Sequence, residues 1–383
     1  MLTALVNGRL LTDQGARDRR AVLIEGGRVR AVVPDAELPR DAKRVDLEDL
    51  LLLPGFVDVQ VNGGGGVLFG DAPSLETLET MAEAHRRFGT TAFLPTLISS
   101  DLDLIRDAIA VVDAAIESGV AGIAGIHIEG PFLSPARRGI HDVSKFRKLD
   151  ASAVTLLSSL RHGKTLVTLA PEETTPDMIA ALHKAGVIVS AGHTNATYAE
   201  TRAALDAGLS GFTHLFNAMS PLASRAPGVV GAALDDRDSW CGLIVDGRHV
   251  DPVTMRVALH CRSTDRLMLV TDAMPSVGAR EKSFRLHGRL IRAEDGACVA
   301  EDGTLAGTDL DMASAVRNAM RFLGLDLFAA TRMASQNPAM FLGLAGEMGR
   351  IALGSRANLV LATDQLSVIR SWIDGREVGG GRE

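Results

Sequence analysis

The sequence has little cysteine, few aromatic residues and no long apolar run. Its three cysteines, Cys241, Cys261 and Cys298, are far apart, odd in number and without a CxxC pair, which argues against a disulfide framework. No apolar stretch approaches the roughly 20 residues that cross a bilayer. The first residues also lack the basic-then-apolar order of a signal peptide. These absences predict a cytoplasmic protein with no membrane partner.

An excess of positive charge is also missing. There are 40 lysine and arginine residues against 47 aspartate and glutamate residues, so the formal net charge is −7. This balance argues against a general affinity for nucleic acid, although it allows a local basic pocket for a small anion. What is present is length and apolar content: 383 residues, 46% of them hydrophobic. Such a chain suits one barrel-sized domain with a smaller one, or two ordinary domains.

Apolar strand-like segments alternate with amphipathic helical segments through most of the chain. We expect eight strands, which begin near residues 53, 90, 123, 164, 187, 211, 240 and 266. Alternation of this kind predicts a parallel sheet, and eight repeats favour closure into a (β/α)8 TIM-like barrel. After the eighth strand, residues 284–298 resemble an inserted hairpin.

The two ends of the chain have β character instead. Asn7-Gly8 and Gly26-Gly27 each predict a hairpin turn near the N-terminus. Strand-like patterns return over residues 350–363 and 366–378. We therefore expect residues 1–52 and 350–383 to form one small β-sandwich domain, interrupted by a catalytic barrel that spans residues 53–349.

Four of the expected barrel strands end in a side chain suited to metal chemistry, namely Glu129, His193, His214 and Asp272. The carboxyl ends of barrel strands form the catalytic face, so these residues are expected to converge. One carboxylate and two imidazoles make an open site for a single divalent ion. Zinc is the expected ion, with iron, manganese or cobalt as alternatives. Asp272 would then act as the general base.

Each of these residues also has a structural interpretation. A lone histidine at a strand end is more often packed or hydrogen-bonded than metal-binding, and His127, two residues before Glu129, is expected one layer deeper in the barrel. The shared position of His193 and His214 at the ends of successive strands favours the metal site.

Seven motifs resemble those of a known family. They occupy residues 127–132, 139–141, 191–194, 213–219, 246–249, 270–273 and 303–307. In order and spacing they are similar to the amidohydrolase superfamily and, within it, to the N-acetylglucosamine-6-phosphate deacetylases. The resemblance implies metal-dependent hydrolysis of the acetamide of N-acetylglucosamine 6-phosphate, which gives glucosamine 6-phosphate and acetate.

The resemblance also implies roles for individual residues. Glu129, His193 and His214 would hold the ion, Asp272 would be the acid and base, and His141 would stabilise the oxyanion that develops on the acetamide. Further substrate contacts would come from Ile140, Asn217, Ala218, Arg225, His249, Leu305, Ala306 and Gly307. The family's phosphate site is completed by a second subunit, so a homodimer is implied, with Arg225 or His249 crossing the interface.

One departure from the superfamily pattern concerns the first barrel strand. Members with two metals carry His-x-His there, whereas this sequence has Gln60 and Asn62. Neutral amides are poor ligands for a second zinc ion. The sequence therefore predicts one tightly held ion, with Gln60 touching metal-bound water at most.

Three alternatives stay open. A deacetylase of N-acetylgalactosamine 6-phosphate or another N-acyl amidohydrolase would use the same metal chemistry. Arg225, in a loop stiffened by proline and glycine, and His249 favour a phosphorylated substrate but do not set the configuration at C4. A non-catalytic scaffold or sugar-phosphate sensor is the third, although such proteins usually lose ligands and all four key residues are present here.

Overall fold

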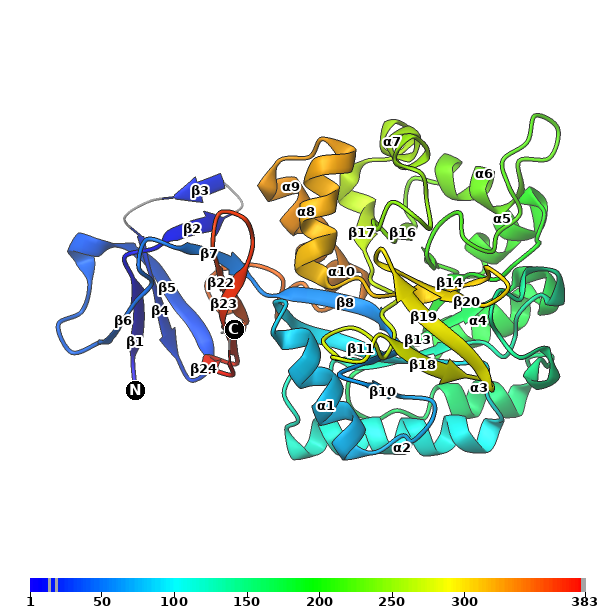
Figure 1. The fold of residues 1–383 in the computed structure, drawn as a ribbon, viewed down its shortest axis with the longest axis horizontal. Coiled ribbons are helices and arrows are strands. Elements are labelled where there is room, and N and C mark those ends of the chain that lie inside the picture. The colour runs from blue at the N-terminus through cyan, green and yellow to red at the C-terminus, as the bar shows by residue number, and fades with distance from the viewer. Residues whose placement is uncertain (13–14, 18–19, 380–383) are drawn as a thin grey trace.

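The computed structural model describes residues 1–12, 15–17 and 20–379. Two parts are visible in Figure 1: a large barrel with helices around it, and a smaller unit made of strands from both ends of the chain. Strand β7 (Leu51–Pro54) belongs to the small unit and β8 (Phe56–Val61) to the barrel, so the chain passes between them at Gly55.

All eight predicted barrel strands are present and every neighbouring pair is parallel. In addition to β8 they are β11 (Thr90–Ile98), β12 (Gly125–Glu129), β13 (Lys164–Leu169), β14 (Ile188–Ala191), β15 (Gly211–Phe212), β16 (Trp240–Leu243) and β17 (Leu267–Leu269). A parallel bridge between Val61 and Ala273 joins the end of the last strand to the first. The predicted (β/α)8 barrel is confirmed.

Helices cover the outside of the barrel (Figure 1). They are α1 (Leu75–Arg86), α2 (Leu102–Ser118), α3 (Ala151–Leu157), α4 (Pro176–Lys184), α5 (Tyr198–Asp206), α6 (Gly228–Asp235), α7 (Pro252–Cys261), α8 (Met312–Leu323), α9 (Leu327–Ala334) and α10 (Gln336–Phe341). In α2, Ile105, Ile109 and Val112 are buried because their three- and four-residue spacing places them on one face. Helix α5 begins with a capping box between Thr197 and Glu200. Among the described residues, no helix is both long and apolar enough to span a membrane.

The small unit is a sandwich of two sheets. One has the order β5 (Arg28–Pro34), β4 (Arg20–Glu25), β1 (Thr3–Val6), β6 (Lys43–Asp46). The other has the order β24 (Arg376–Glu377), β23 (Val368–Ile373), β22 (Leu359–Ala362), β7, β2 (Arg9–Thr12), β3 (Gly15–Arg17). Its core combines Val22 and Ile24 of the first sheet with Leu359 and Trp372 of the second. The predicted β-sandwich from both chain ends is therefore confirmed.

One of the two predicted hairpins is wrong. The turn at Gly26-Gly27 does join antiparallel β4 and β5. At Asn7-Gly8, however, the chain crosses from one sheet to the other, because β1 pairs with β4 and β6 whereas β2 pairs with β3 and β7. Leu5 and Leu10 thereby enter the shared core from the two different sheets. Burial of both leucines outweighs the local preference of Asn-Gly for a hairpin.

The insertion after β17 is larger than the predicted hairpin. It is a four-stranded antiparallel sheet of β18 (Ser283–Leu286), β19 (Arg289–Glu294), β20 (Ala297–Ala300) and β21 (Leu305–Thr308). Leu286, Ile291 and Ala306 of this sheet pack with Ile98 and Met274, which lie at the carboxyl ends of barrel strands or just after them. The short strands β9 (Gly63–Gly64) and β10 (Val67–Leu68) complete the fold. The inserted sheet thus forms one wall above the barrel opening.

Candidate active site

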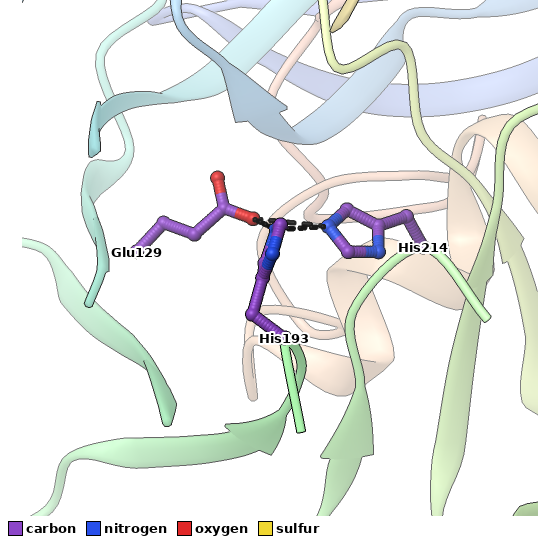
Figure 2. Close-up of side chains that lie close together, drawn as sticks. All are labelled: Glu129, His193 and His214. Atoms are coloured by element: carbon purple, nitrogen blue, oxygen red, sulfur yellow. Dashed lines mark hydrogen bonds and ion pairs between the residues drawn. The ribbon is translucent and has the colours of Figure 1, made fainter. Parts of the chain in front are cut away.

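Glu129, His193 and His214 meet at the carboxyl end of the barrel (Figure 2). Glu129 is the last residue of β12, and the two histidines follow β14 and β15 at the same distance. Glu129 Oε1 lies 3.0 Å from His214 Nε2 and 3.3 Å from His193 Nε2, and the two Nε2 atoms are 3.2 Å apart. All three side chains are buried. One carboxylate oxygen and two imidazole nitrogens therefore face a common point.

The hydrogen bonding of His193 fits a metal ligand. Its Nδ1 lies 2.9 Å from the carbonyl oxygen of Arg137, which can only accept, so Nδ1 carries the hydrogen. The Nε2 lone pair is then directed at Glu129 and His214, as in metal sites where an outer partner fixes the tautomer. Burial raises the pKa of Glu129, but contacts with His193 and His214 outweigh it and hold that pKa well below its usual range. An ionised carboxylate with two imidazoles suits a divalent cation.

The backbone at this site is unusual in a way that the sequence did not indicate. His193, His214 and Asp272 all have positive φ angles, of 47°, 34° and 52°. Non-glycine residues in such regions cost about 1–3 kcal/mol each and concentrate at functional sites. All three occur just after a barrel strand, where the chain turns sharply and the side chain stays over the barrel opening. Three of the four key residues of the candidate site therefore have a strained backbone, and so do Phe216 and Ala218 in the turn that follows His214.

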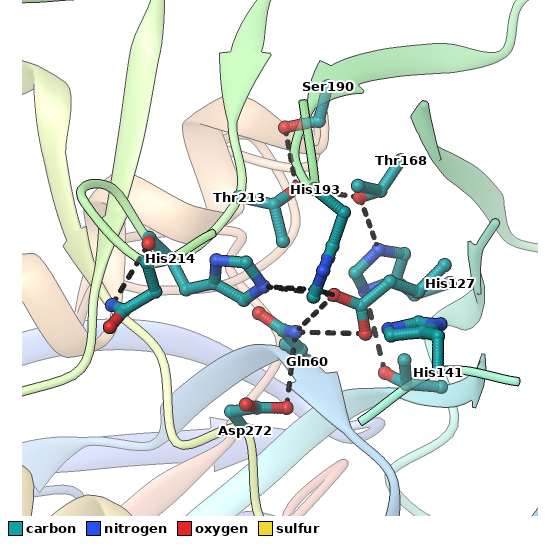
Figure 3. Close-up of polar contacts among 12 residues, drawn as sticks. Gln60, His127, His141, Thr168, Ser190, His193, Thr213, His214 and Asp272 are labelled. Atoms are coloured by element: carbon teal, nitrogen blue, oxygen red, sulfur yellow. Dashed lines mark hydrogen bonds and ion pairs between the residues drawn. The ribbon is translucent and has the colours of Figure 1, made fainter. Parts of the chain in front are cut away.

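Asp272 lies beside the cluster and is held by two amides, of which Figure 3 shows that of Gln60. Asn62 Nδ2 donates to Asp272 Oδ1 at 2.7 Å, and Gln60 Nε2 donates to the same oxygen at 3.2 Å. Burial and the nearby charge of Glu129 raise the pKa of Asp272 to about 6. A carboxylate with a pKa near neutrality is well matched to general base catalysis. Asn62 was expected only as a missing ligand, and its contact with Asp272 gives it a positioning role.

A buried layer of polar groups lies beneath these residues. Thr271 Oγ1 donates to Asp58 Oδ2 at 2.5 Å, and burial raises the pKa of Asp58 to about 7. His127 Nε2 lies 2.7 Å from Thr168 Oγ1, and burial lowers the pKa of His127 to about 4. Figure 3 shows His127 behind the cluster, with its ring turned to Thr168. His127 thus lies in the deeper layer that strand alternation predicts. Asp58 was missed, although a charged residue within an apolar strand is a detectable signal.

A cavity of about 540 Å³ opens above the cluster. It is lined by the four key residues and by most of the other predicted ones, namely Ile140, His141, Asn217, Ala218, His249, Leu305, Ala306 and Gly307. Arg225 and Gln60 are the exceptions, because neither is part of the described cavity wall. Arg225 is exposed, in the loop between Met219 and α6, whereas Gln60 is buried against Glu129. The cavity volume is in the range of small-molecule sites.

Asp246 is a residue that the sequence reasoning missed. Its Oδ2 lies 2.5 Å from Nδ1 of His249, and its Oδ1 accepts from the backbone N–H groups of Arg248 and His249. Asp246 is therefore positioned to accept the Nδ1 hydrogen, which directs Nε2 of His249 away from the carboxylate. The three-residue spacing of an aspartate and a histidine was the available signal.

The chain is similar in sequence to known proteins over nearly its whole length. Residues 51–378 match the amidohydrolase family. The N-acetylgalactosamine-6-phosphate deacetylase of Shewanella sp. (strain ANA-3) is 42% identical over 369 residues, covering 96% of this chain and 93% of that protein. The N-acetylglucosamine-6-phosphate deacetylase of Haemophilus influenzae is 36% identical, covering 98% of this chain and 99% of that protein.

The fold is also similar to that of solved structures. The crystal structure of N-acetylglucosamine-6-phosphate deacetylase from Pasteurella multocida has a TM-score of 0.95 and 36% identity, and the similarity covers 99% of this chain and all of that one. A mutant of the Mycobacterium smegmatis enzyme, solved in complex with N-acetyl-D-glucosamine 6-phosphate, has a TM-score of 0.89 and 33% identity. It covers 98% of this chain and 99% of that one.

Proposed function

The chain belongs to the amidohydrolase family, and on that basis we propose that it hydrolyses the acetamide of N-acetylglucosamine 6-phosphate to glucosamine 6-phosphate and acetate. The observation that carries the proposal is the convergence of Glu129, His193, His214 and Asp272 at the base of one cavity. Loss of any of these would favour a scaffold or sensor. All four are present and line one cavity, which supports the proposal.

We propose that Glu129, His193 and His214 hold one divalent ion. Zinc is the expected ion, with iron, manganese or cobalt as alternatives. Such an ion, when bound, polarises a carbonyl group and lowers the pKa of water. Asp272, with its raised pKa, accepts the proton of the attacking water and delivers it to the leaving nitrogen. His141, in the cavity wall, donates to the carbonyl oxygen as negative charge develops there.

The remaining predicted residues would bind and enclose the sugar phosphate. Asn217 and the backbone at Ala218 would contact the sugar, and Leu305, Ala306 and Gly307 of the inserted sheet, which line the same cavity, would enclose it. His249 supplies a donor for the phosphate. We propose that Arg225, which is exposed and outside its own cavity, reaches the phosphate site of a second subunit in a cytoplasmic homodimer.

A second candidate is deacetylation of N-acetylgalactosamine 6-phosphate, which the name of the Shewanella relative favours. The two sugars differ only at C4, and the metal chemistry is the same for both. Turnover of both phosphorylated sugars and of their unphosphorylated forms distinguishes the possibilities. We expect the highest kcat/KM with N-acetylglucosamine 6-phosphate and a large loss without the phosphate. Binding of sugar phosphate by metal-loaded protein without any acetate release would contradict the proposal.

A further inference from the structure

Ser99 contacts the imidazole of His141 from a part of the barrel that contributes no predicted site residue. Ser99 directly follows β11, and its Oγ lies 2.8 Å from His141 Nδ1. The backbone N–H of Ser99 also points at this nitrogen, with N and Nδ1 3.4 Å apart. Ser99 is 2% exposed and His141 5% exposed, so water competes little for these contacts.

These two contacts determine which nitrogen of His141 carries the hydrogen. A backbone N–H can only donate, so Nδ1 of the neutral ring must accept, and the Ser99 hydroxyl can donate to the same nitrogen. The hydrogen is then on Nε2. Because the Nδ1 edge of the ring faces Ser99, the Nε2 edge faces the cavity that His141 lines. Figure 3 shows the His141 ring beside His193, and the ring centroids are 4.3 Å apart.

We propose that Ser99 is a positioning residue that holds His141 as the Nε2–H tautomer, with its donor directed at the acyl oxygen of the substrate. This inference rests on the proposed amide hydrolysis. In the other tautomer Nε2 would present a lone pair to an oxygen that gains negative charge, and the contact would be repulsive. Ser99 therefore makes His141 a donor rather than only filling space beneath it.

The surrounding backbone leaves room for this hydroxyl. Gly130, the first residue after β12, has a φ of 87°, and a Cβ built on it would lie 2.3 Å from Ser99 Oγ. Any larger residue at position 130 would displace the Ser99 side chain. The absence of a side chain at Gly130 thus leaves space for the Ser99–His141 contact next to the metal cluster.

A double-mutant cycle separates positioning through His141 from a general structural effect. Ser99→Ala is expected to lower kcat roughly tenfold, the effect of one hydrogen bond, with a smaller change in KM. In the His141→Ala background the same change is expected to cause no further loss, because the two residues act as a unit. Equal losses in both backgrounds, or no loss in the first, would overturn the proposal. Ser100→Ala is the matched control, since Ser100 Oγ bonds to the Ile98 carbonyl instead.

The tautomer of His141 can also be determined by NMR spectroscopy, without substrate or catalysis. In zinc-loaded protein with 15N-labelled histidine, the ring nitrogens of His141 are identified by the signals lost in His141→Ala. We expect a protonated Nε2 and an unprotonated Nδ1 in the wild-type protein. The reverse pattern would overturn the proposal even if Ser99→Ala fails to fold. Wild-type protein inactive on every acetylated sugar phosphate would instead refute the proposed function and leave this result standing.

Discussion

The side-chain amide of Gln60 binds the carboxylate of Glu129, with Nε2 3.1 Å from each of its two oxygens. The same nitrogen lies 3.2 Å from Oδ1 of Asp272. A nitrogen surrounded by three carboxylate oxygens is a donor and has no lone pair for a metal ion. Gln60 therefore links the candidate ligand Glu129 to the candidate base Asp272.

This contact predicts the metal stoichiometry. With Gln60 and Asn62 both donating to carboxylates, the first strand offers no second set of ligands, so we expect one tightly bound ion per chain. Inductively coupled plasma mass spectrometry on protein freed of loose metal by gel filtration measures this directly. Two tight ions per active chain would contradict the expectation.

Asp272→Asn should abolish most turnover without removing the metal. The amide keeps the shape of the side chain but cannot accept the proton, so kcat should fall by about 10²- to 10⁴-fold. Metal content should match the wild type, because Asp272 is not one of the three clustered ligands. Asp364→Asn, on the exposed surface of the small unit, is the control and should leave kcat unchanged. Near-normal turnover of Asp272→Asn would remove this residue from the mechanism.

Asp246→Asn should affect recognition of the phosphate rather than the chemistry. The variant amide can retain the backbone contacts through its oxygen, but its NH2 group then faces Nδ1 of His249 and forces the other tautomer. Nε2 would change from donor to acceptor, so KM for phosphorylated substrate should rise roughly 10- to 100-fold. Steady-state kinetics on the unphosphorylated sugar provide the comparison. An equal rise in KM for both sugars would refute this role.

Asp113 should stabilise the fold in a pH-dependent way. This buried carboxylate in α2 accepts bonds from the Arg161 and His162 side chains at 2.6 and 2.9 Å. Burial raises the pKa of Asp113, but these hydrogen bonds outweigh it and lower the pKa overall. Because the folded pKa lies below the unfolded value of about 3.9, the contribution is present above that pH and is lost as pH falls through the folded pKa.

We therefore expect Asp113→Ala to cost about 1–3 kcal/mol of unfolding free energy at pH 7. Urea denaturation of wild type and variant at matched pH should show the difference shrinking below about pH 4. Asp103→Ala, on the exposed face of the same helix, should stay within about 0.5 kcal/mol of wild type. A pH-independent gap for Asp113→Ala would contradict the assignment.

The barrel and the polar ends of its strands were predictable because their signals are repeated and local. Glu129, His193, His214 and Asp272 each close a strand whose apolar pattern is clear in the sequence. Parallel strands in a barrel bring such ends to one face, so their convergence follows from topology. The residues around the cavity, such as His249, were identified only through resemblance to a family.

The features that the sequence did not indicate depend on contacts between residues that are far apart in the chain. The Ser99–His141 and Asn62–Asp272 pairs join positions 42 and 210 residues apart, and no local pattern indicates either. The false hairpin at Asn7-Gly8 has the opposite cause, since a strong local turn signal was overridden by burial of Leu5 and Leu10 in the sandwich. The positive φ angles of the two histidines likewise arise only in the folded barrel.

The most direct test of the account is acetate release from N-acetylglucosamine 6-phosphate by protein of known metal content. Activity should rise in proportion to bound ion, reach its maximum at one ion per chain, disappear on chelation and return when zinc is added back. Protein that holds one ion per chain in the Glu129, His193 and His214 cluster, yet releases no acetate from this sugar phosphate or from its galactosamine counterpart, would contradict it.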